Sequence, residues 1–193
     1  MGLTSFRTLL VPCALMVAAA CTSPASAQAT AASTQLASSA PAPAARPADV
    51  SSMEAIMKAV YDVISGPQGQ KRDWDRMRSL FVPGARLIPV HVGKDGTGEV
   101  HVLSVEDFIR RAAPVMEKEG FFERESHRTV DRYGDIAQVF STYESRHAAT
   151  DAKPFQRGIN SFQLMFDGHR WWVVTIYWQG ETPDAPIPKK YGG

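Results

Sequence analysis

Two consecutive β-hairpins between Phe121 and Glu181 constrain the fold of this sequence more than any other feature. In the first hairpin, Gly134 and Asp135 tolerate the positive φ angles of a two-residue turn. In the second, a loop at residues 168–170 separates two strands rich in aromatic and β-branched residues. Because side chains alternate between the two faces of a strand, the turns determine the register and therefore which face is buried.

Counting outward from these turns predicts the cross-strand pairs of the sheet. The pairs are Arg128 beside Ser141, Ser126 beside Tyr143, Phe166 beside Trp172, Leu164 beside Val174, Phe162 beside Ile176, and Asn160 beside Trp178. One face then carries Ala137, Val139, Phe162, Leu164, Phe166, Trp172, Val174 and Ile176. This face is predicted to form the core.

Toward one end of the strands, the predicted core face becomes polar. The side chains gathered there are Ser126, Arg128, Ser141, Tyr143, Asn160 and Trp178. Burying polar groups without partners costs roughly 1–3 kcal/mol each, so these groups need one another, water or a ligand. We predict a pocket in which they bind a small, partly apolar molecule, with Arg128 meeting any negative charge. The alternative is that a bulge turns Arg128 outward and that Tyr143 and Trp178 are core aromatics.

The opposite face of the sheet also carries apolar side chains, among Thr142, Gln163 and Thr175. They are Phe140, Ile159, Met165, Trp171, Val173 and Tyr177. A large apolar surface on a soluble protein usually marks a contact site. We therefore expect a homodimer packed through this face, and a role as a protein-interaction module is a further hypothesis.

Residues 1–27 have the features of a secretory signal peptide. Arg7 supplies the positive charge, residues 9–20 form a short apolar stretch, and Ala25-Ser26-Ala27 is a cleavage motif. Export to the bacterial periplasm or the extracellular space is expected. A competing site at residues 18–21 resembles a lipobox, and its use would lipidate Cys21 and anchor the protein to a membrane.

Composition excludes several functional classes. Both cysteines, Cys13 and Cys21, lie in the leader region, so the domain has no disulfide and no thiol nucleophile. Without the leader, 20 basic residues balance 20 acidic ones, which gives no electrostatic reason to bind nucleic acid. The five histidines lack zinc-like spacing, and no phosphate-binding loop, nucleophile elbow or HExxH motif occurs. We expect neither a metal nor a cofactor.

Residues 28–50 are rich in Ala, Ser and Pro and are predicted to form a flexible linker. One α+β domain is expected at residues 51–182, followed by an extended tail at 183–193. Helices are expected to begin at Ser51 with Glu54 as a capping box, at Asp73, and at Ser104. Between the last two helices we expect a strand pair at residues 85–92 and 99–103, with Pro89 marking an edge strand.

The order of helices, strand pair, helix and long hairpins resembles the nuclear transport factor 2-like superfamily, in its SnoaL-like and ketosteroid-isomerase-like branch. The matching segments are DWDRMRSLFVPGARLIPV, YGDIAQVFSTYESR and RGINSFQLMFDGHRWWVVTIYWQGE. The resemblance implies a curved antiparallel sheet wrapped around N-terminal helices, with a cone-shaped cavity, as in cystatin-like folds. Members of the superfamily include isomerases, cyclases, dehydratases and binding modules, so the fold alone does not assign a function.

Enzymes of the ketosteroid-isomerase-like type need a carboxylate base and hydrogen-bond donors for an oxyanion. Tyr143 is the expected donor. The register turns the acids of these strands away from the core, namely Glu123, Glu125, Asp131 and Glu144. Asp62 or Asp107 could supply a base from a helix. Binding without catalysis is therefore favoured, with a cofactor-free isomerase or hydratase as the alternative.

The same register places Glu125 directly beside Glu144. Like charges in such a pair repel each other. Either Arg124 or Arg146 neutralises the pair, or the strand bulges.

Overall fold

A computed structural model describes residues 42–93 and 96–193. The predicted signal peptide, Cys21 and the part of the predicted linker up to residue 41 lie outside the described residues. The helices are α1 (Pro47–Val50), α2 (Met53–Ile64), α3 (Trp74–Leu80) and α4 (Val105–Glu119). The strands are β1 (Phe81–Val92), β2 (Gly98–Val100), β3 (Phe122–Tyr133), β4 (Ile136–Arg146), β5 (Gln156–Phe166) and β6 (Trp171–Gly180).

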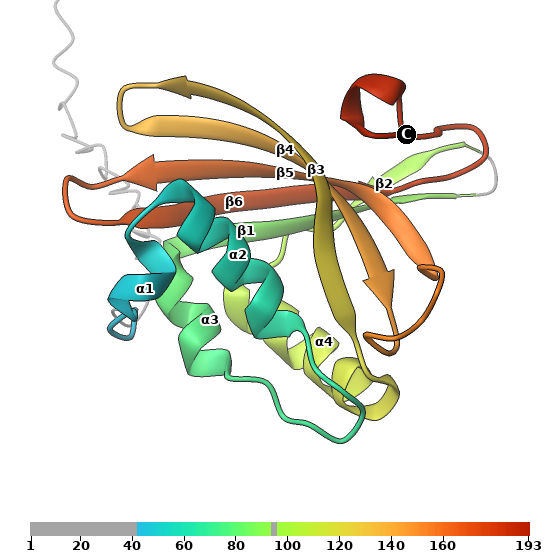
Figure 1. The fold of residues 1–193 in the computed structure, drawn as a ribbon, viewed down its shortest axis with the longest axis horizontal. Helices are drawn as coiled ribbons and strands as arrows, with labels where there is room; N and C mark the ends of the chain where they lie inside the picture. Colours follow the sequence, from blue (N-terminus) through green and yellow to red (C-terminus); the bar gives the residue numbers. More distant parts are fainter. Residues whose placement is uncertain (1–41, 94–95) are drawn as a thin grey trace, which may run out of the picture. The chain divides into compact units, whose positions relative to one another are not determined.

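The six strands form one sheet in the order β2-β1-β6-β5-β4-β3. Every neighbouring pair is antiparallel except β1 and β6, which run parallel. Helices α1 to α4 lie on one side of this curved sheet, as Figure 1 shows. The expected α+β class is thus confirmed. Pro89 does not mark an edge, because β1 lies between β2 and β6; the pairing with β6 joins segments distant in sequence and has no local signal.

Side-chain caps begin the three longer helices. Asp73 caps α3, and Ser104 with Asp107 forms a capping box on α4. Helix α2 is capped by Ser52, whose Oγ accepts a hydrogen bond from the Ala55 amide at 3.0 Å. The capping box predicted from Ser51 and Glu54 is therefore wrong: the cap lies one residue later, and Ala55 has no side-chain acceptor to complete a box.

The domain also extends to residues before Ser51. Helix α1 covers the last four residues of the predicted linker, and Asp49 and Val50 within it are buried. The Asp49 carboxylate accepts hydrogen bonds from Nε and Nη2 of Arg76, each at 2.8 Å. This ion pair lowers the pKa of Asp49 and ties α1 to α3. The linker prediction is wrong for these residues. Asp49 and Val50 are buried in the domain, and the Ala-, Ser- and Pro-rich composition around them gives no sign of this.

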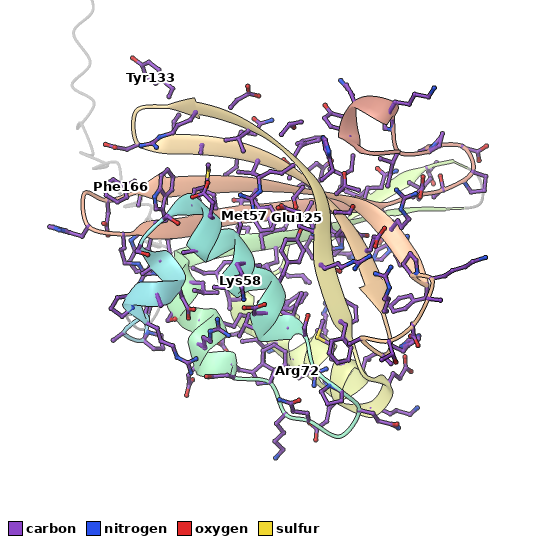
Figure 2. The ribbon with its side chains drawn as sticks, viewed as in Figure 1. Met57, Lys58, Arg72, Glu125, Tyr133 and Phe166 are labelled. Carbon is purple, nitrogen blue, oxygen red and sulfur yellow. The ribbon has the colours of Figure 1, made fainter. Side chains whose placement is uncertain are left out.

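The core lies between the helices and the inner face of the sheet. Ile56 and Leu80 from the helices, with Phe81, Val139 and Phe162 from the strands, are at most 1% exposed. Arg72 closes the end of this layer, between the last turn of α2 and the end of α4 (Figure 2). Its guanidinium donates to the backbone carbonyls of Ile64, Gly66, Pro67, Gln70 and Met116.

A β-bulge at Ser126 changes the first hairpin. The predicted pairs hold from Tyr133 back to His127, and then the register shifts, so that Glu125 pairs with Tyr143. The predicted pairing of Ser126 with Tyr143 is wrong. Since one residue is skipped, Glu123 and Glu125 turn to the inner face, opposite to the prediction. The repulsion between Glu125 and Glu144 is avoided, because Glu144 now pairs with Arg124 and its carboxylate accepts a hydrogen bond from that guanidinium at 2.8 Å.

A second bulge, at Val174, changes the other hairpin near its loop. Asn160 pairs with Trp178 and Phe162 with Ile176, as predicted. Beyond the bulge, Leu164 pairs with Val173 and Phe166 with Trp171, so the predicted pairs with Val174 and Trp172 are wrong. The loop holds four residues instead of three, and Asp167 Oδ1 accepts the backbone amides of His169 and Arg170 within it, each at 2.8 Å. Trp171 and Val173, predicted for the outer face, are consequently buried in the core.

The segment after Gly180 crosses the outer face of the sheet, on the side opposite the helices (Figure 1). Ile187 is buried, and the Tyr191 ring lies 5.3 Å from the Phe140 ring. Thr142 Oγ1 donates a hydrogen bond to the Tyr191 carbonyl at 2.6 Å. The predicted extended tail is therefore packed on the domain, and residues Lys189–Tyr191 form a short 3₁₀ helix.

Candidate functional site

A cavity of about 270 Å³ lies between the helices and the inner face of the sheet. Its walls are largely apolar, with Val60, Met77, Leu87, Met116 and Ile176 among the lining residues. The polar lining residues are Tyr61, Glu123, Tyr143, Ser145, Gln156 and Asn160. An apolar cavity with a few convergent polar groups is the usual form of a small-molecule site, and the volume of this one is just below the common range of about 300–1,000 Å³.

Glu123 is the one charged side chain among the described residues that line the cavity. Each carboxyl oxygen has one donor: Ser145 Oγ at 2.7 Å from Oε2, and Asn160 Nδ2 at 3.3 Å from Oε1. The backbone amide of Glu123 donates to Ser65 Oγ at 3.0 Å, which fixes the strand against the end of α2. Burial raises the pKa of Glu123 to about 7, and the two hydrogen bonds only partly oppose this.

Tyr143 presents the other candidate group. Its hydroxyl makes no hydrogen bond to another described residue, and it is not among the fully buried polar atoms that lack a partner, although the residue as a whole is 5% exposed. Burial and the nearby Glu123 raise the pKa of Tyr143, so the hydroxyl stays neutral and can donate a hydrogen bond. Gly158, paired with Tyr143 across the sheet, permits this position, because a β-carbon at 158 would lie 2.5 Å from the Tyr143 hydroxyl.

A buried polar network supports one end of the cavity. Asn160 Nδ2 donates to the Tyr61 hydroxyl at 3.1 Å, and the Tyr61 hydroxyl lies 2.7 Å from Ser141 Oγ. Ser141 Oγ in turn donates to the carboxylate of Glu125, which pairs with Arg128 at 2.7 Å. Burial raises the pKa of Tyr61 as well.

The structure brings three of the six predicted ligand-binding residues into the cavity lining: Tyr143, Asn160 and Trp178. Ser141 lies behind this lining, in the polar network, and Arg128 is held by Glu125. Ser126 occupies the bulge and donates to the Thr142 carbonyl at 3.3 Å. Whether any of the six binds a ligand stays a prediction.

The sequence prediction missed Glu123, Ser145 and Tyr61. Strict alternation along the strand predicts the outer face for Glu123, and the bulge at Ser126 turns its side chain to the inner face. The repulsion expected between Glu125 and Glu144 was the available signal of an irregular strand. Tyr61 comes from α2, and hairpin register says nothing about which helical residue lies over the sheet.

Aromatic rings enclose the rest of the cavity. Trp178 and Phe108 of α4 make an edge-to-face contact with ring centroids 6.3 Å apart. Phe121 and Phe155 also line the cavity, and Phe155 is 51% exposed and stacks on His147 at 4.2 Å. One wall of the cavity is therefore formed by a ring that also faces solvent.

Within residues 42–93 and 96–193, no group of three or more His, Cys, Asp or Glu residues could hold a metal ion. His91 and His101 have ring centroids 5.7 Å apart, and His101 lies 3.2 Å from Glu99, which makes a surface cluster. Among the same described residues, no helix has the length and hydrophobicity needed to cross a membrane.

Solved structures of low sequence identity share this fold. A protein of unknown function with a cystatin-like fold from Nostoc punctiforme PCC 73102 is 11% identical; the match covers 70% of this chain and 92% of that chain, with a TM-score of 0.51. An NTF2-like protein of unknown function from Silicibacter pomeroyi DSS-3 is 17% identical, with 68% and 94% coverage and a TM-score of 0.47. No protein-family model matches the sequence, and no curated protein sequence matches it significantly. The likeness to the Nostoc structure confirms the predicted cystatin-like α+β fold.

Proposed function

We propose that this protein is a cofactor-free acid–base enzyme that moves a proton on a small, neutral, largely apolar carbonyl compound. The observation that carries the proposal is the carboxyl group of Glu123 inside an apolar cavity, with its pKa raised to about 7. A general base works best when its pKa lies near the working pH. Binding without catalysis was favoured only because no acid was expected on the inner face, and the bulge at Ser126 removes that objection.

The roles of the polar groups follow from their positions. Glu123 would remove a proton from the carbon next to the carbonyl, and negative charge would develop on the carbonyl oxygen. Tyr143 has a hydroxyl without a protein partner and would donate a hydrogen bond to that oxygen. The protonated Glu123 would return the proton to a more distant carbon, which isomerises the compound, or to a departing hydroxyl group, which dehydrates it.

The polarity of the cavity favours a neutral substrate. No Lys, Arg or His is among its described lining residues, so a carboxylate or phosphate group would meet no counter-charge beside Glu123. The apolar walls and the aromatic rings of Phe108 and Trp178 suit a hydrocarbon body.

The test uses cyclohex-3-en-1-one as a probe in deuterated buffer. Proton NMR measures both deuterium uptake next to the carbonyl and conversion to the conjugated enone. The wild-type protein should accelerate both, and Glu123→Gln should lose the acceleration. Equal rates for wild type and Glu123→Gln would contradict the proposal. A small molecule found bound by native mass spectrometry, together with those equal rates, would support a binding protein instead.

The cellular setting and the assembly belong to the same proposal. We propose an exported protein, free or anchored through Cys21, that forms a homodimer through the outer sheet face. Tyr177 on that face is 47% exposed, which supports the contact. The packed C-terminal segment covers Phe140 and leaves less apolar area than the sequence suggested. The intact mass of the mature protein tests the anchor, and light scattering at micromolar concentration tests the dimer.

A further inference from the structure

We infer that Glu125, which is outside the cavity lining, positions the side-chain amide of Asn160 and through it the carboxyl group of Glu123. The two acids are joined by a chain of hydrogen bonds through Ser141, Tyr61 and Asn160. This chain crosses from β3 to β4, to α2, to β5 and back to β3. Its bearing on catalysis rests on the proposed function, whereas the chain itself is tested independently of any activity.

Glu125 determines which group donates and which accepts at each step of this hydrogen-bond chain. Arg128 donates to Oε1 of Glu125 through Nε at 2.8 Å, and its Nη2 lies 2.7 Å from the same oxygen. Oε2 is left to accept from Ser141 Oγ. A hydroxyl group has a single proton, so Ser141 can only accept from the Tyr61 hydroxyl, 2.7 Å away.

The same reasoning fixes the groups closer to the cavity. The Tyr61 proton is committed to Ser141, and the Tyr61 oxygen therefore accepts from Asn160 Nδ2 at 3.1 Å. The amide of Asn160 is held with its NH₂ group toward Tyr61 and Glu123, and the second NH₂ proton serves Oε1 of Glu123. Tyr61 is thus a positioning residue, and Tyr143 is left as the tyrosine hydroxyl that can donate to a ligand.

Few other ionisable groups act on Glu123. Tyr61 faces it from α2 and Tyr143 from β4, and the described cavity lining contains no cation. The cation closest along the chain of contacts, Arg128, is bound to Glu125. Replacing Glu125 by a neutral residue therefore has two opposing effects on the pKa of Glu123. Loss of a like charge lowers this pKa. Reversal of the direction of donation along the hydrogen-bond chain raises it.

The variant Glu125→Gln separates these effects by their sign. Arg128 retains the oxygen of the new amide, so its NH₂ group faces Ser141 and donates to it. Ser141 then donates to Tyr61, and Tyr61 donates to Asn160, whose amide must turn its oxygen toward Tyr61. Glu123 loses one donor, and its pKa should rise by about 1.

The pKa of Glu123 is measured by ¹³C NMR titration of protein labelled at the glutamate carboxyl carbon. A lowered or unchanged value in Glu125→Gln would overturn the inference, because only charge removal or no coupling would then remain. Ser141→Ala cuts the same chain without changing any charge. The buried Tyr61 hydroxyl then has no acceptor except the Asn160 amide oxygen, so the amide turns, Glu123 loses the same donor, and its pKa should also rise. This second variant gives the answer where Glu125→Gln does not fold.

Glu144→Gln is the matched control. Glu144 is also paired with arginines, at 2.8 Å from Arg124 and 2.9 Å from Arg146, and it makes no hydrogen bond to Tyr61 or Asn160. The Glu144→Gln variant should leave the pKa of Glu123 within about 0.3 of the wild-type value. If neither Glu125→Gln nor Ser141→Ala raises the pKa of Glu123, the positioning role of Glu125 is contradicted and the acid–base proposal is unaffected. If Glu123→Gln keeps full activity, the acid–base proposal is contradicted and the positioning role is unaffected.

Discussion

Glu123 accepts a hydrogen bond from Asn160 at 3.3 Å, across a sheet in which the two residues lie on strands separated by β4. The contact requires that β3 skip one residue at Ser126, because an uninterrupted strand would turn Glu123 to the other face. It brings a carboxyl group into a cavity whose other described lining residues carry no charge. The proposed chemistry depends on this one irregularity.

The raised pKa of Glu123 predicts how stability changes with pH. Below its ordinary value of 4.5, the carboxyl group is protonated in both the folded and unfolded states. Between 4.5 and about 7 the unfolded chain loses the proton first, so the free energy of unfolding falls, in total by on the order of 3 kcal/mol. Glu123→Gln should lack this fall. Urea denaturation of both proteins at pH 5 and pH 8 measures the fall. The same change in the free energy of unfolding for wild type and Glu123→Gln would count against a raised pKa.

The rate of proton transfer should follow the ionisation of Glu123. We expect the rate with cyclohex-3-en-1-one to rise with pH and to level off above about pH 7, since the base must be deprotonated. Tyr143→Phe should lower kcat/KM by about 100-fold without moving the midpoint, because the hydroxyl stabilises the oxyanion and is not the base. Steady-state kinetics from pH 5 to 9 tests both. A shifted midpoint with an unchanged rate would contradict the role of Tyr143.

Gly158 is expected to tolerate no side chain. A β-carbon there would lie 2.4 Å from the Gln179 carbonyl oxygen and 2.5 Å from the Tyr143 hydroxyl. Gly158→Ala should lower the free energy of unfolding by about 2–3 kcal/mol and displace Tyr143. Gly98→Ala on β2, where no atom lies within 4 Å of the new carbon, is the control and should change stability by less than about 0.5 kcal/mol. Equal stability of the two variants would contradict the packing around Gly158.

Arg72 should be irreplaceable by lysine. Its planar guanidinium satisfies several backbone carbonyls at once where α2 and α4 end, and an ammonium group offers only three donors without that geometry. Arg72→Lys should cost about 2–4 kcal/mol in the free energy of unfolding, measured with urea. The exposed Arg86, replaced by lysine in the same way, should be nearly neutral. A neutral Arg72→Lys would show that water replaces the lost bonds.

Much of the fold followed from local patterns. The turn at Gly134 and the caps at Asp73 and Ser104 follow from the sequence, because each depends on residues close in the chain. The pairing of Asn160 with Trp178 is also as predicted, because the fourth loop residue and the bulge at Val174 offset each other. The parallel pairing of β1 with β6 was not predicted, since it joins segments far apart in the chain.

The candidate site was harder to predict than the fold. No glycine or proline marks the bulge at Ser126, and the bulge at Val174 lies within an unbroken run of strand-forming residues. The first bulge reverses the faces of the β3 residues that precede Ser126, and the second reverses the faces of the β6 residues between the loop and Val174. For Glu123 that reversal changed the interpretation from a cavity without a base to one that has a base.

A ¹³C NMR titration of the Glu123 carboxyl carbon in the wild-type protein tests the central claim most directly. The account predicts a midpoint near pH 7, because the group lies in an apolar cavity where none of the lining residues that the structure describes is a cation. A midpoint near 4.5, the ordinary value for this side chain, would mean that the carboxyl group faces water and that β3 does not bring it into the cavity.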